Sequence, residues 1–464
     1  MVFSSLNFIF LFLPLALALY YLARGRWLRN FVLFLTSLFF YAWGEPVYVL
    51  LMVLSVTVNY LVGRGIGRFR AREQEGRARL LFWLSVVFNL GLLGVFKYSG
   101  FLVGTVNGLF GLALPVPQLT LPIGISFYTF QIMTYVIDVY RREVEVQRSY
   151  VALGAYIAMY PQLIAGPIVR YGDIAAQLQD RRETLEGFAS GVRVFTMGLA
   201  KKVLLANLCG KIADGVLGAE GFGTAAAWLG VLAYAFQIYF DFSGYSTMAI
   251  GLGEMMGFRM PENFRYPYIS RSVTEFWRRW HITLSTFFRD YLYIPLGGNR
   301  VPEARWYLNI FIVWFATGLW HGASWNFVLW GLYYGALLVL EKKLLSKWLS
   351  KLPAAVGWAY TALATLFGWV IFYQTDFAGI GRTFAALFGF GGTETALSLG
   401  VLSYLPILIP AALFATPLPK RLYDRARGSM AGVVLCDLLL MGLFVLSVAS
   451  LTSDTFNPFI YFRF

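Results

Sequence analysis

The sequence predicts an all-α protein that crosses a membrane many times. Of its 464 residues, 58% are hydrophobic and only 13% are charged, whereas soluble domains carry about 25% charged residues. The mean hydropathy is +0.63. Apolar runs recur from one end of the chain to the other, and roughly 20 apolar residues suffice to cross the hydrocarbon core of a bilayer. We therefore expect one integral membrane domain that covers residues 1–464.

The apolar runs also place the expected membrane spans. Several runs are too short to cross, so we expect about eleven crossings together with re-entrant and interfacial helices. The run at 150–167 is expected to be re-entrant, because Pro161, Gly166 and Pro167 free backbone groups that only neighbouring protein or a water-filled cavity can satisfy at membrane depth. The expected spans lie near residues 3–22, 31–43, 47–63, 80–98, 121–138, 150–167, 187–206, 227–253, 307–330, 331–346, 356–373, 399–416 and 431–451.

The formal net charge of +14 favours a membrane protein rather than a nucleic-acid-binding protein. Basic residues gather in short loops between apolar runs, as the positive-inside rule describes. The loop at 64–79 holds six arginines against Glu73 and Glu75, so we place it in the cytoplasm. Cys209 and Cys436 lie in or beside apolar runs, and no disulfide framework or metal motif is expected from them.

The segment 254–306 is expected to form an amphipathic insert at the membrane interface. From Val273 to Tyr291, apolar side chains recur at helical spacing with polar side chains opposite them, which predicts one amphipathic helix. A turn at Pro295–Asn299 ends this helix. Its aromatic stripe holds Val273, Phe276, Trp277, Trp280, Leu284, Phe287, Phe288 and Tyr291, and its polar face holds Arg271, Glu275, Arg278, Ser285 and Arg289.

His321 lies within residues 306–340, which contain no Asp, Glu, Lys or Arg. An ionisable side chain in such surroundings is a candidate functional residue. The stretch is too long for one straight span, so we expect a hairpin that breaks near Gly331, with His321 near the middle of its first arm. In an unbroken helix, Thr317 and Trp325 would share the face of His321. A buried neutral histidine that donates to a backbone carbonyl is the alternative.

Two further residues are candidates on similar grounds. His281 is the only other histidine of the chain and lies between the aromatic and polar faces of the expected interfacial helix. An ordinary interfacial histidine is the alternative there. Asp241 lies in an apolar run, where a carboxylate needs a partner, and the alternative to a functional role is a structural ion pair with a nearby Arg or Lys.

The residue types restrict the chemistry. Two histidines without a cysteine or a third imidazole do not indicate a zinc site, and no metal is expected. Motifs of zinc proteases, serine hydrolases and phosphate-binding loops are not found in the sequence. A buried imidazole tends to be neutral and can accept a proton from a hydroxyl. That chemistry fits the transfer of an acyl group from a thioester to an alcohol.

The sequence resembles the membrane-bound O-acyltransferase superfamily, and in particular the bacterial branch that includes the alginate O-acetyltransferase membrane subunit. The resemblance covers essentially the full length. It is carried by the segments FYAWGEP (40–46), LPIGISFYTF (121–130), PQLIAGPI (161–168), DFSGYS (241–246), EFWRRWH (275–281), FRDYLYIPLGG (288–298), GLWHG (318–322) and NPFIYFRF (457–464).

The resemblance implies a ring of tilted helices around a central passage in the cytoplasmic membrane of a bacterium. It implies that His321 is the catalytic histidine and that His281 is the second site histidine. The donor would be acetyl-CoA, with Arg278 and Arg279 near its phosphates. The acceptor would be a secreted polysaccharide, reached through an extracytoplasmic SGNH-type transferase or other polysaccharide-modification proteins. Supporting roles would fall to Asp241, Trp277, Arg289, Asp290, Tyr293 and Trp325.

Two readings without acyl-transfer chemistry remain open at this stage. A transporter or flippase for a lipid-linked sugar would also span the membrane many times, although the chain has no internal repeat of the kind that such transporters often show. A non-catalytic anchor for a periplasmic transferase would need neither histidine. The polymer, the nature of the acyl group and the oligomeric state are left open by the sequence.

Overall fold

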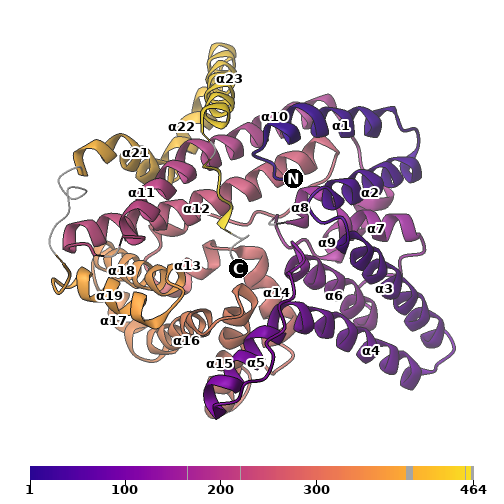
Figure 1. The fold of residues 1–464 in the computed structure, drawn as a ribbon. Helices are drawn as coiled ribbons and strands as arrows, with labels where there is room; N and C mark the ends of the chain where they lie inside the picture. Colours follow the sequence, from indigo (N-terminus) through magenta and orange to yellow (C-terminus); the bar gives the residue numbers. More distant parts are fainter. Residues whose placement is uncertain (165, 220, 393–400, 455, 461–464) are drawn as a thin grey trace. The chain divides into compact units, whose positions relative to one another are not determined.

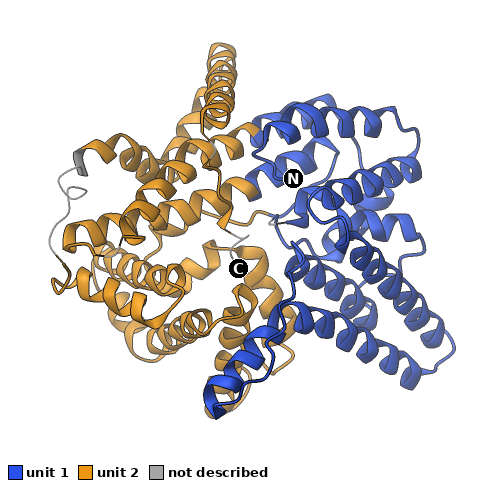
Figure 2. Cartoon of the chain, in the orientation of Figure 1, with its two compact units in different colours: residues 1–195, 246–261 blue, residues 196–245, 262–464 orange. Residues whose placement is uncertain are grey.

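The computed structural model describes residues 1–164, 166–219, 221–392, 401–454 and 456–460. These residues form helices and loops and contain no β-strand. Their contacts define two compact units: unit 1 comprises residues 1–195 and 246–261, and unit 2 comprises residues 196–245 and 262–464 (Figure 2). The expected single domain stays a prediction.

Unit 1 is built from the helices of the first two fifths of the chain, with the last turns of a later helix added (Figure 1). Three consecutive segments, α4, η2 and α5, join into one helix from Glu75 to Phe110. The elements are η1 (Phe8–Phe12), α1 (Leu13–Leu22), α2 (Arg26–Ala42), α3 (Tyr48–Arg70), α4 (Glu75–Leu93), η2 (Gly94–Tyr98), α5 (Ser99–Phe110), α6 (Ile125–Arg141), α7 (Tyr150–Ala158), α8 (Tyr160–Leu163), α9 (Tyr171–Gln179) and most of α10 (Leu185–Ala200).

Unit 2 contains the greater part of α12 and the helices that follow it (Figure 1). The elements are η3 (Lys201–Ala206), α11 (Asn207–Leu217), α12 (Thr224–Met255), η4 (Pro267–Ile269), α13 (Val273–Arg279), α14 (Ile282–Phe288), η5 (Arg289–Tyr293), α15 (Glu303–His321), α16 (Trp325–Leu340), η6 (Glu341–Leu345), α17 (Ser346–Leu349), α18 (Ala354–Tyr373), α19 (Phe377–Leu387), α21 (Val401–Phe414), α22 (Leu418–Ala426) and α23 (Met430–Ser453).

Five helices among the described residues are long and apolar enough to cross a membrane: α3, the joined helix 75–110, α12, α18 and α23. The all-helical, multi-pass fold that the sequence predicts is therefore confirmed. These helices differ in their surroundings, because the apolar window of α12 is 83% buried inside the protein whereas that of α23 is 17% buried. The outward side chains of α23, such as Leu438 and Leu439, suit contact with lipid, and α12 is an interior helix.

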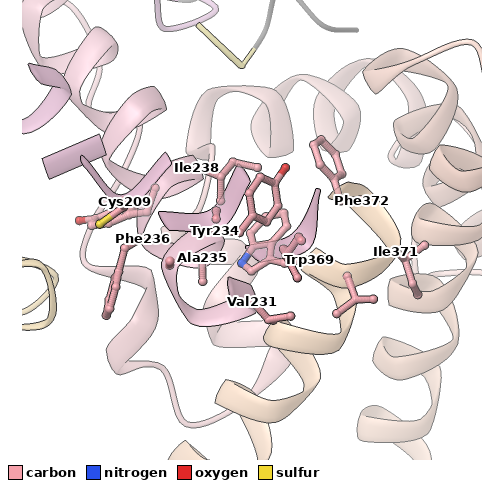
Figure 3. Packing of buried hydrophobic residues seen from close by; sticks show 14 of the residues in the cluster. Cys209, Val231, Tyr234, Ala235, Phe236, Ile238, Trp369, Ile371 and Phe372 are labelled. Carbon is pink, nitrogen blue, oxygen red and sulfur yellow. The ribbon is translucent and has the colours of Figure 1, made fainter. Parts of the chain in front are cut away.

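The core of unit 2 is aromatic and surrounds α12 and α18. Tyr234 of α12 and Trp369 and Phe372 of α18 belong to this cluster of buried side chains (Figure 3), and the Trp369 and Phe372 ring centroids are 5.7 Å apart. The Trp369 indole donates a hydrogen bond to the Tyr268 hydroxyl over 3.1 Å, and this hydroxyl in turn donates to the carbonyl of Ala235 over 2.5 Å. Buried Tyr and Trp side chains need such partners for their polar ends, so this network fixes how α18 packs on α12.

A buried charge cluster holds together the loops of unit 1 around Glu183. The Glu183 carboxylate, whose side chain is 6% exposed, accepts hydrogen bonds from Arg26 and Arg29 over 2.6 and 2.5 Å. The Tyr20 hydroxyl donates to the same carboxylate over 2.7 Å, and Arg181 lies 3.6 Å away. Burial opposes the charge on Glu183, but the hydrogen bonds from Arg26 and Tyr20 outweigh it and hold the pKa at about 2.

Two expectations about helix boundaries are corrected by the structure, and a third stays untested. The hairpin at 306–340 breaks at residues 322–324 and not near Gly331, because Gly322 adopts an extended backbone after His321. The expected single helix from Val273 to Tyr291 is two helices, α13 and α14, because His281 takes a left-handed conformation between them. The run at 150–167 is broken at Met159, ahead of Pro161, but its re-entrant path stays a prediction. The expected start of the 399–416 span, Ala165 and the 461–464 end of the NPFIYFRF segment lie outside the described residues.

Candidate functional site

The α15–α16 hairpin positions His321 at the last residue of α15. Two glycines let the two helices approach closely, since a Cβ atom on Gly318 would lie 2.4 Å from the Phe327 carbonyl oxygen and one on Gly331 would lie 2.2 Å from the Trp314 carbonyl oxygen. A real Cβ atom does not fit at such distances. The small residues of the TGLWHG segment therefore serve the packing of α15 against α16, and this packing sets the place of His321.

The His321 ring lies in a cage of aromatic side chains. Its centroid is 4.9 Å from that of Trp330, 5.0 Å from that of Trp320 and 5.4 Å from that of Phe372, with the rings nearly perpendicular. Such edge-to-face contacts are favourable beyond the burial of area. Only 4% of the residue surface is exposed. A substrate can reach this imidazole only after some of these side chains have moved.

His281 is held by backbone geometry and by a polar partner. Its φ of +44° lies in the left-handed region, which non-glycine residues adopt rarely and at a cost of about 1–3 kcal/mol. The turn is stabilised by Asn263, whose backbone carbonyl accepts from Ile282 N–H over 3.0 Å. The Asn263 side-chain oxygen also accepts from the Thr283 N–H and hydroxyl over 3.2 and 2.9 Å. The strain at His281 is therefore held by a local network around one asparagine.

This network determines which nitrogen of His281 carries a proton. The Nδ1 atom lies 3.0 Å from the side-chain Oδ1 of Asn263. This atom is the amide oxygen rather than the amide nitrogen, because the backbone N–H of Thr283 donates to it as well. Nδ1 therefore donates, and in the neutral ring Nε2 keeps its lone pair. Nε2 is buried without a hydrogen-bond partner among the described residues. His281 lies outside the five membrane-spanning helices, and burial lowers its pKa, with charge on His321 lowering it further.

The two histidines, forty positions apart, belong to one aromatic cluster of unit 2. The Trp320 ring contacts both imidazoles, with centroids 5.8 Å from His281 and 5.0 Å from His321. The ring of Phe242 of α12 also contacts His281, with the two centroids 4.6 Å apart. The arrangement brings the two imidazoles into contact with one indole, and the lowered pKa favours the neutral form of His281. Such a pair can accept a proton and pass it on within a site that excludes water.

Trp277 and Tyr293 lie in the packed parts of unit 2 around the hairpin. The buried Trp277 ring contacts Trp314, Trp330 and Tyr334 with centroid distances of 4.9, 5.5 and 4.8 Å. It therefore supports the same hairpin that carries His321. The Tyr293 hydroxyl accepts a hydrogen bond from the Trp306 indole over 3.1 Å, which ties η5 to the start of α15.

The predicted arginines have different surroundings. Arg279 forms a salt bridge with Glu275 over 2.7 Å and donates to the Arg265 carbonyl oxygen over 3.2 Å, so its guanidinium is already used within the fold. Arg278 is exposed and faces a groove. The Arg289 side chain is exposed and pairs with the adjacent Asp290 over 2.6 Å. The donor-binding role predicted for Arg278 and Arg279 stays a prediction.

Trp325 does not lie where an unbroken helix would have placed it. It is the first residue of α16 rather than a continuation of α15, and 48% of its surface is exposed. The expectation that Trp325 shares a helix face with His321 is therefore wrong. Thr317 does precede His321 by one turn on α15, where its hydroxyl donates to the Val313 carbonyl oxygen over 2.7 Å.

Asp241 has the ion-pair partner that its position on α12 requires. Its carboxylate lies 2.7 Å from the Lys202 ammonium, and both side chains are buried. Residues that follow α23 contact this pair. The Ile460 N–H donates to Asp241 over 2.8 Å, and the Lys202 ammonium donates to the Pro458 carbonyl oxygen. This geometry fits the structural alternative for Asp241, and its supporting role in catalysis stays a prediction.

Sequence reasoning missed two residues that position the site. Asn263 lies 18 positions before His281 in an irregular loop, and no periodicity marks it. Glu341 directly follows the long uncharged stretch, and this abrupt charge is a signal that could have been used. Its buried carboxylate accepts from the N–H groups of Val273 and Thr274 over 2.8 Å each. Glu341 thereby anchors the N-terminus of α13, where a negative charge is favourable.

No three His, Cys, Asp or Glu side chains come together as metal ligands would within the part of the chain that the structure describes.

Comparisons with known proteins agree with this architecture. The family model described as MBOAT, the membrane-bound O-acyltransferase family, matches residues 1–378. The chain is 41% identical to the "Probable alginate O-acetylase AlgI" of Pseudomonas putida and 40% identical to that of Azotobacter vinelandii, with 100% of both chains covered in each case. It is 34% identical to the peptidoglycan O-acetyltransferase of Helicobacter pylori over 85% of this chain and 81% of the relative.

The class of protein is therefore a multi-pass membrane enzyme that transfers acyl groups to hydroxyls. The chain belongs to the membrane-bound O-acyltransferase family.

Proposed function

We propose that this protein transfers an acetyl group from acetyl-CoA in the cytoplasm to a hydroxyl on the outer side of a bacterial cytoplasmic membrane. The names of its similar relatives support acetyl as the acyl group, since these relatives are described as O-acetylases and O-acetyltransferases. Alginate and peptidoglycan, which those names mention, are polymers of sugars. A secreted polysaccharide is the proposed final acceptor, reached directly or through an extracytoplasmic SGNH-type transferase. The proposal includes about eleven crossings around a central passage.

The single observation that carries the proposed mechanism is the pair of buried imidazoles in one aromatic cluster. In the proposed step, an acceptor hydroxyl attacks the carbonyl carbon of the thioester, a C–O bond forms, and the C–S bond breaks. His321 accepts the hydroxyl proton as general base or relay, and the departing thiolate receives a proton, so that an ester and a free thiol result. General-base assistance of this kind contributes about 10²–10⁴-fold to a rate.

His281 is proposed to act as the second site histidine. Its Nδ1–H is engaged by Asn263, so Nε2 is the nitrogen available for a proton. Removal of water by the surrounding aromatic rings suits a thioester, because water in the site would hydrolyse it. Trp277 and Tyr293 are proposed to support the hairpin, and Arg289, Asp290, Trp325 and Asp241 keep the supporting roles that the family resemblance implies.

The test uses the purified full chain in lipid nanodiscs with acetyl-CoA labelled in the acetyl group and alginate as the hydroxyl acceptor. We expect His321→Ala to reduce release of free CoA and loss of label from the thioester by at least about 10²-fold. Lys347→Ala, an exposed change on α17, is the matched control and should keep wild-type turnover. Thermal unfolding of each variant reports whether the protein is folded.

Two outcomes would contradict the proposal. Wild-type turnover in a folded His321→Ala variant would exclude a catalytic role for this histidine. It would favour the alternative that the protein is a non-catalytic anchor for a periplasmic transferase. Movement of a labelled lipid-linked sugar across the nanodisc membrane or a vesicle membrane, without any thioester cleavage by the wild type, would favour a transporter.

A further inference from the structure

A groove of about 880 Å³ lies within unit 2, between the start of α13, the first turn of α15 and the end of α16. A volume of this size is typical of sites for small organic ligands. The groove carries three cationic side chains together with aromatic and aliphatic walls. The lining residues that matter here are Arg271, Arg278, Lys342, Tyr293, Trp306 and Leu338.

Among the described residues, the three cations of the groove have no carboxylate partner. No Asp or Glu oxygen lies within 4 Å of the charged nitrogens of Arg271, Arg278 or Lys342 among the residues that the structure places. Neighbouring cations are paired, since Arg279 binds Glu275 and Lys343 lies 2.5 Å from Glu303. The one carboxylate of the groove, that of Glu341, is buried and accepts the N–H groups at the start of α13. The groove therefore has an excess of positive charge.

The walls of the groove suit a ligand that has both an anionic and an apolar or flat part. The Lys342 ammonium lies 4.1 Å from the centroid of the buried Trp306 ring, a cation–π contact that holds the charge near the groove. Ile310 and Leu338 add aliphatic surface. A ligand of sugar hydroxyls alone would leave the three cations without anionic partners.

The sequence places this groove at the cytoplasmic side of the membrane. Lys342, Lys343, Lys347 and Lys351 follow α16 within one short connection before α18. Such a cluster of lysines next to a membrane-spanning helix marks a cytoplasmic loop. Phosphate esters are the abundant anions on that side, both in soluble cofactors and in the head groups of anionic lipids.

We infer that this groove is a binding site for phosphate esters, with Arg271, Arg278 and Lys342 as the groups that hold the phosphates. Guanidinium groups bind phosphate through paired N–H donors, and an ammonium adds a compact positive charge. Two sources share this chemistry: the phosphates of CoA and the head group of an anionic phospholipid. The CoA source rests on the proposed function, whereas the lipid source does not.

The test compares the wild type, the triple variant Arg271→Ala/Arg278→Ala/Lys342→Ala, and Lys347→Ala as a control that removes one charge from the same loop outside the groove. In the first arm, binding of CoA without an acyl group is measured by calorimetry in phosphatidylcholine nanodiscs. In the second arm, each variant is first placed in nanodiscs that also contain phosphatidylglycerol. It is then purified in detergent, and the amount of phosphatidylglycerol that remains bound to it is measured. We expect the triple variant to lose at least tenfold in affinity in one arm, and the remaining binding to weaken with salt.

Each outcome bears on the inference. Loss of CoA binding in the triple variant alone supports the groove as the site of the donor phosphates. Loss of bound phosphatidylglycerol alone supports the lipid source. Unchanged binding in both arms overturns the inference. If the triple variant does not fold, Arg271→Ala, Arg278→Ala and Lys342→Ala are measured singly. CoA binding that depends on the groove without any acetyl turnover would overturn the proposed function and leave this site standing.

Discussion

The Glu183 carboxylate of unit 1 and the His281 imidazole of unit 2 differ in how completely their polar atoms are satisfied. In unit 1 the Glu183 carboxylate has two arginines and a tyrosine hydroxyl as direct partners. In unit 2 the ring of His281 has one partner, Asn263, and its second nitrogen is buried without one among the described residues. A buried carboxylate with several hydrogen-bond partners stabilises the fold, whereas an available lone pair in an apolar site is suited to proton transfer. This difference fits a structural role for Glu183 and the chemical role that we propose for His281.

The largest effect is expected from removing the Glu183 carboxylate from the buried charge cluster of unit 1. Glu183→Ala leaves three cationic groups facing one another and should lower the free energy of unfolding by about 3 kcal/mol, the lower end for breaking a buried ion pair, because the arginines are partly exposed. The measurement is thermal or denaturant unfolding in detergent, with the exposed Glu186→Ala on α10 as control. Equal stability of the two variants would show that the cluster is not structural.

The next effect concerns the single partner of His281. Asn263→Ala removes the acceptor that orients the ring and should reduce acyl transfer about 10²-fold, with a smaller loss of stability than Glu183→Ala. Asn263→Asp keeps an acceptor and adds negative charge, so it should retain more activity and shift the pH–rate profile to higher pH, because the charge favours the imidazolium. An unshifted profile for Asn263→Asp would contradict the assigned hydrogen bond.

A third change tests the buried ion pair of Lys202 and Asp241 in unit 2. Ile460→Pro removes the N–H that donates a hydrogen bond to the Asp241 carboxylate. The change should lower the free energy of unfolding by about 2 kcal/mol, since hydrogen bonds to charged groups contribute about 1.5–3 kcal/mol. Ile460→Val keeps the N–H and is the control. If both variants unfold alike, the loss comes from packing rather than from the hydrogen bond.

The smallest effect is expected from mild acid. The pKa of Glu183 is held at about 2 against an ordinary value of 4.5, so its contribution is fully present above pH 4.5 and is lost as the pH falls toward 2. The stability difference between the wild type and Glu183→Gln should therefore narrow between pH 5 and pH 3, as followed by the unfolding midpoint. A constant difference over this range would show that Glu183 is not the titrating group.

The fold class could be predicted from hydropathy because length and apolarity are sufficient to define membrane helices. The local conformation of the site could not. The periodicity of residues 273–291 is that of one helix, and it carries no sign that His281 takes a left-handed φ, since that turn depends on Asn263 from another segment. The sequence predicts the break of the hairpin near Gly331, later than the break after His321 that the structure shows. Glycine is typical of helix breaks, but Gly331 instead allows a close contact between two helices.

The candidate histidines were found from the sequence because an imidazole stands out in an uncharged stretch. Their common contact with Trp320 was not predictable, since it depends on how α14 and α15 pack. Asp241 was recognised as a costly charge in the same way, and its partner Lys202 became visible only when α12 and η3 were placed side by side.

The order of Lys202 and Asp241 along the chain has a consequence for biogenesis. Synthesis runs from the N-terminus, so the ribosome delivers the lysine before the carboxylate of α12. An isolated aspartate at the centre of a nascent helix costs about 2.5–3.5 kcal/mol on entering the bilayer. Because its counter-charge has already emerged, α12 can leave the insertion machinery with this aspartate neutralised.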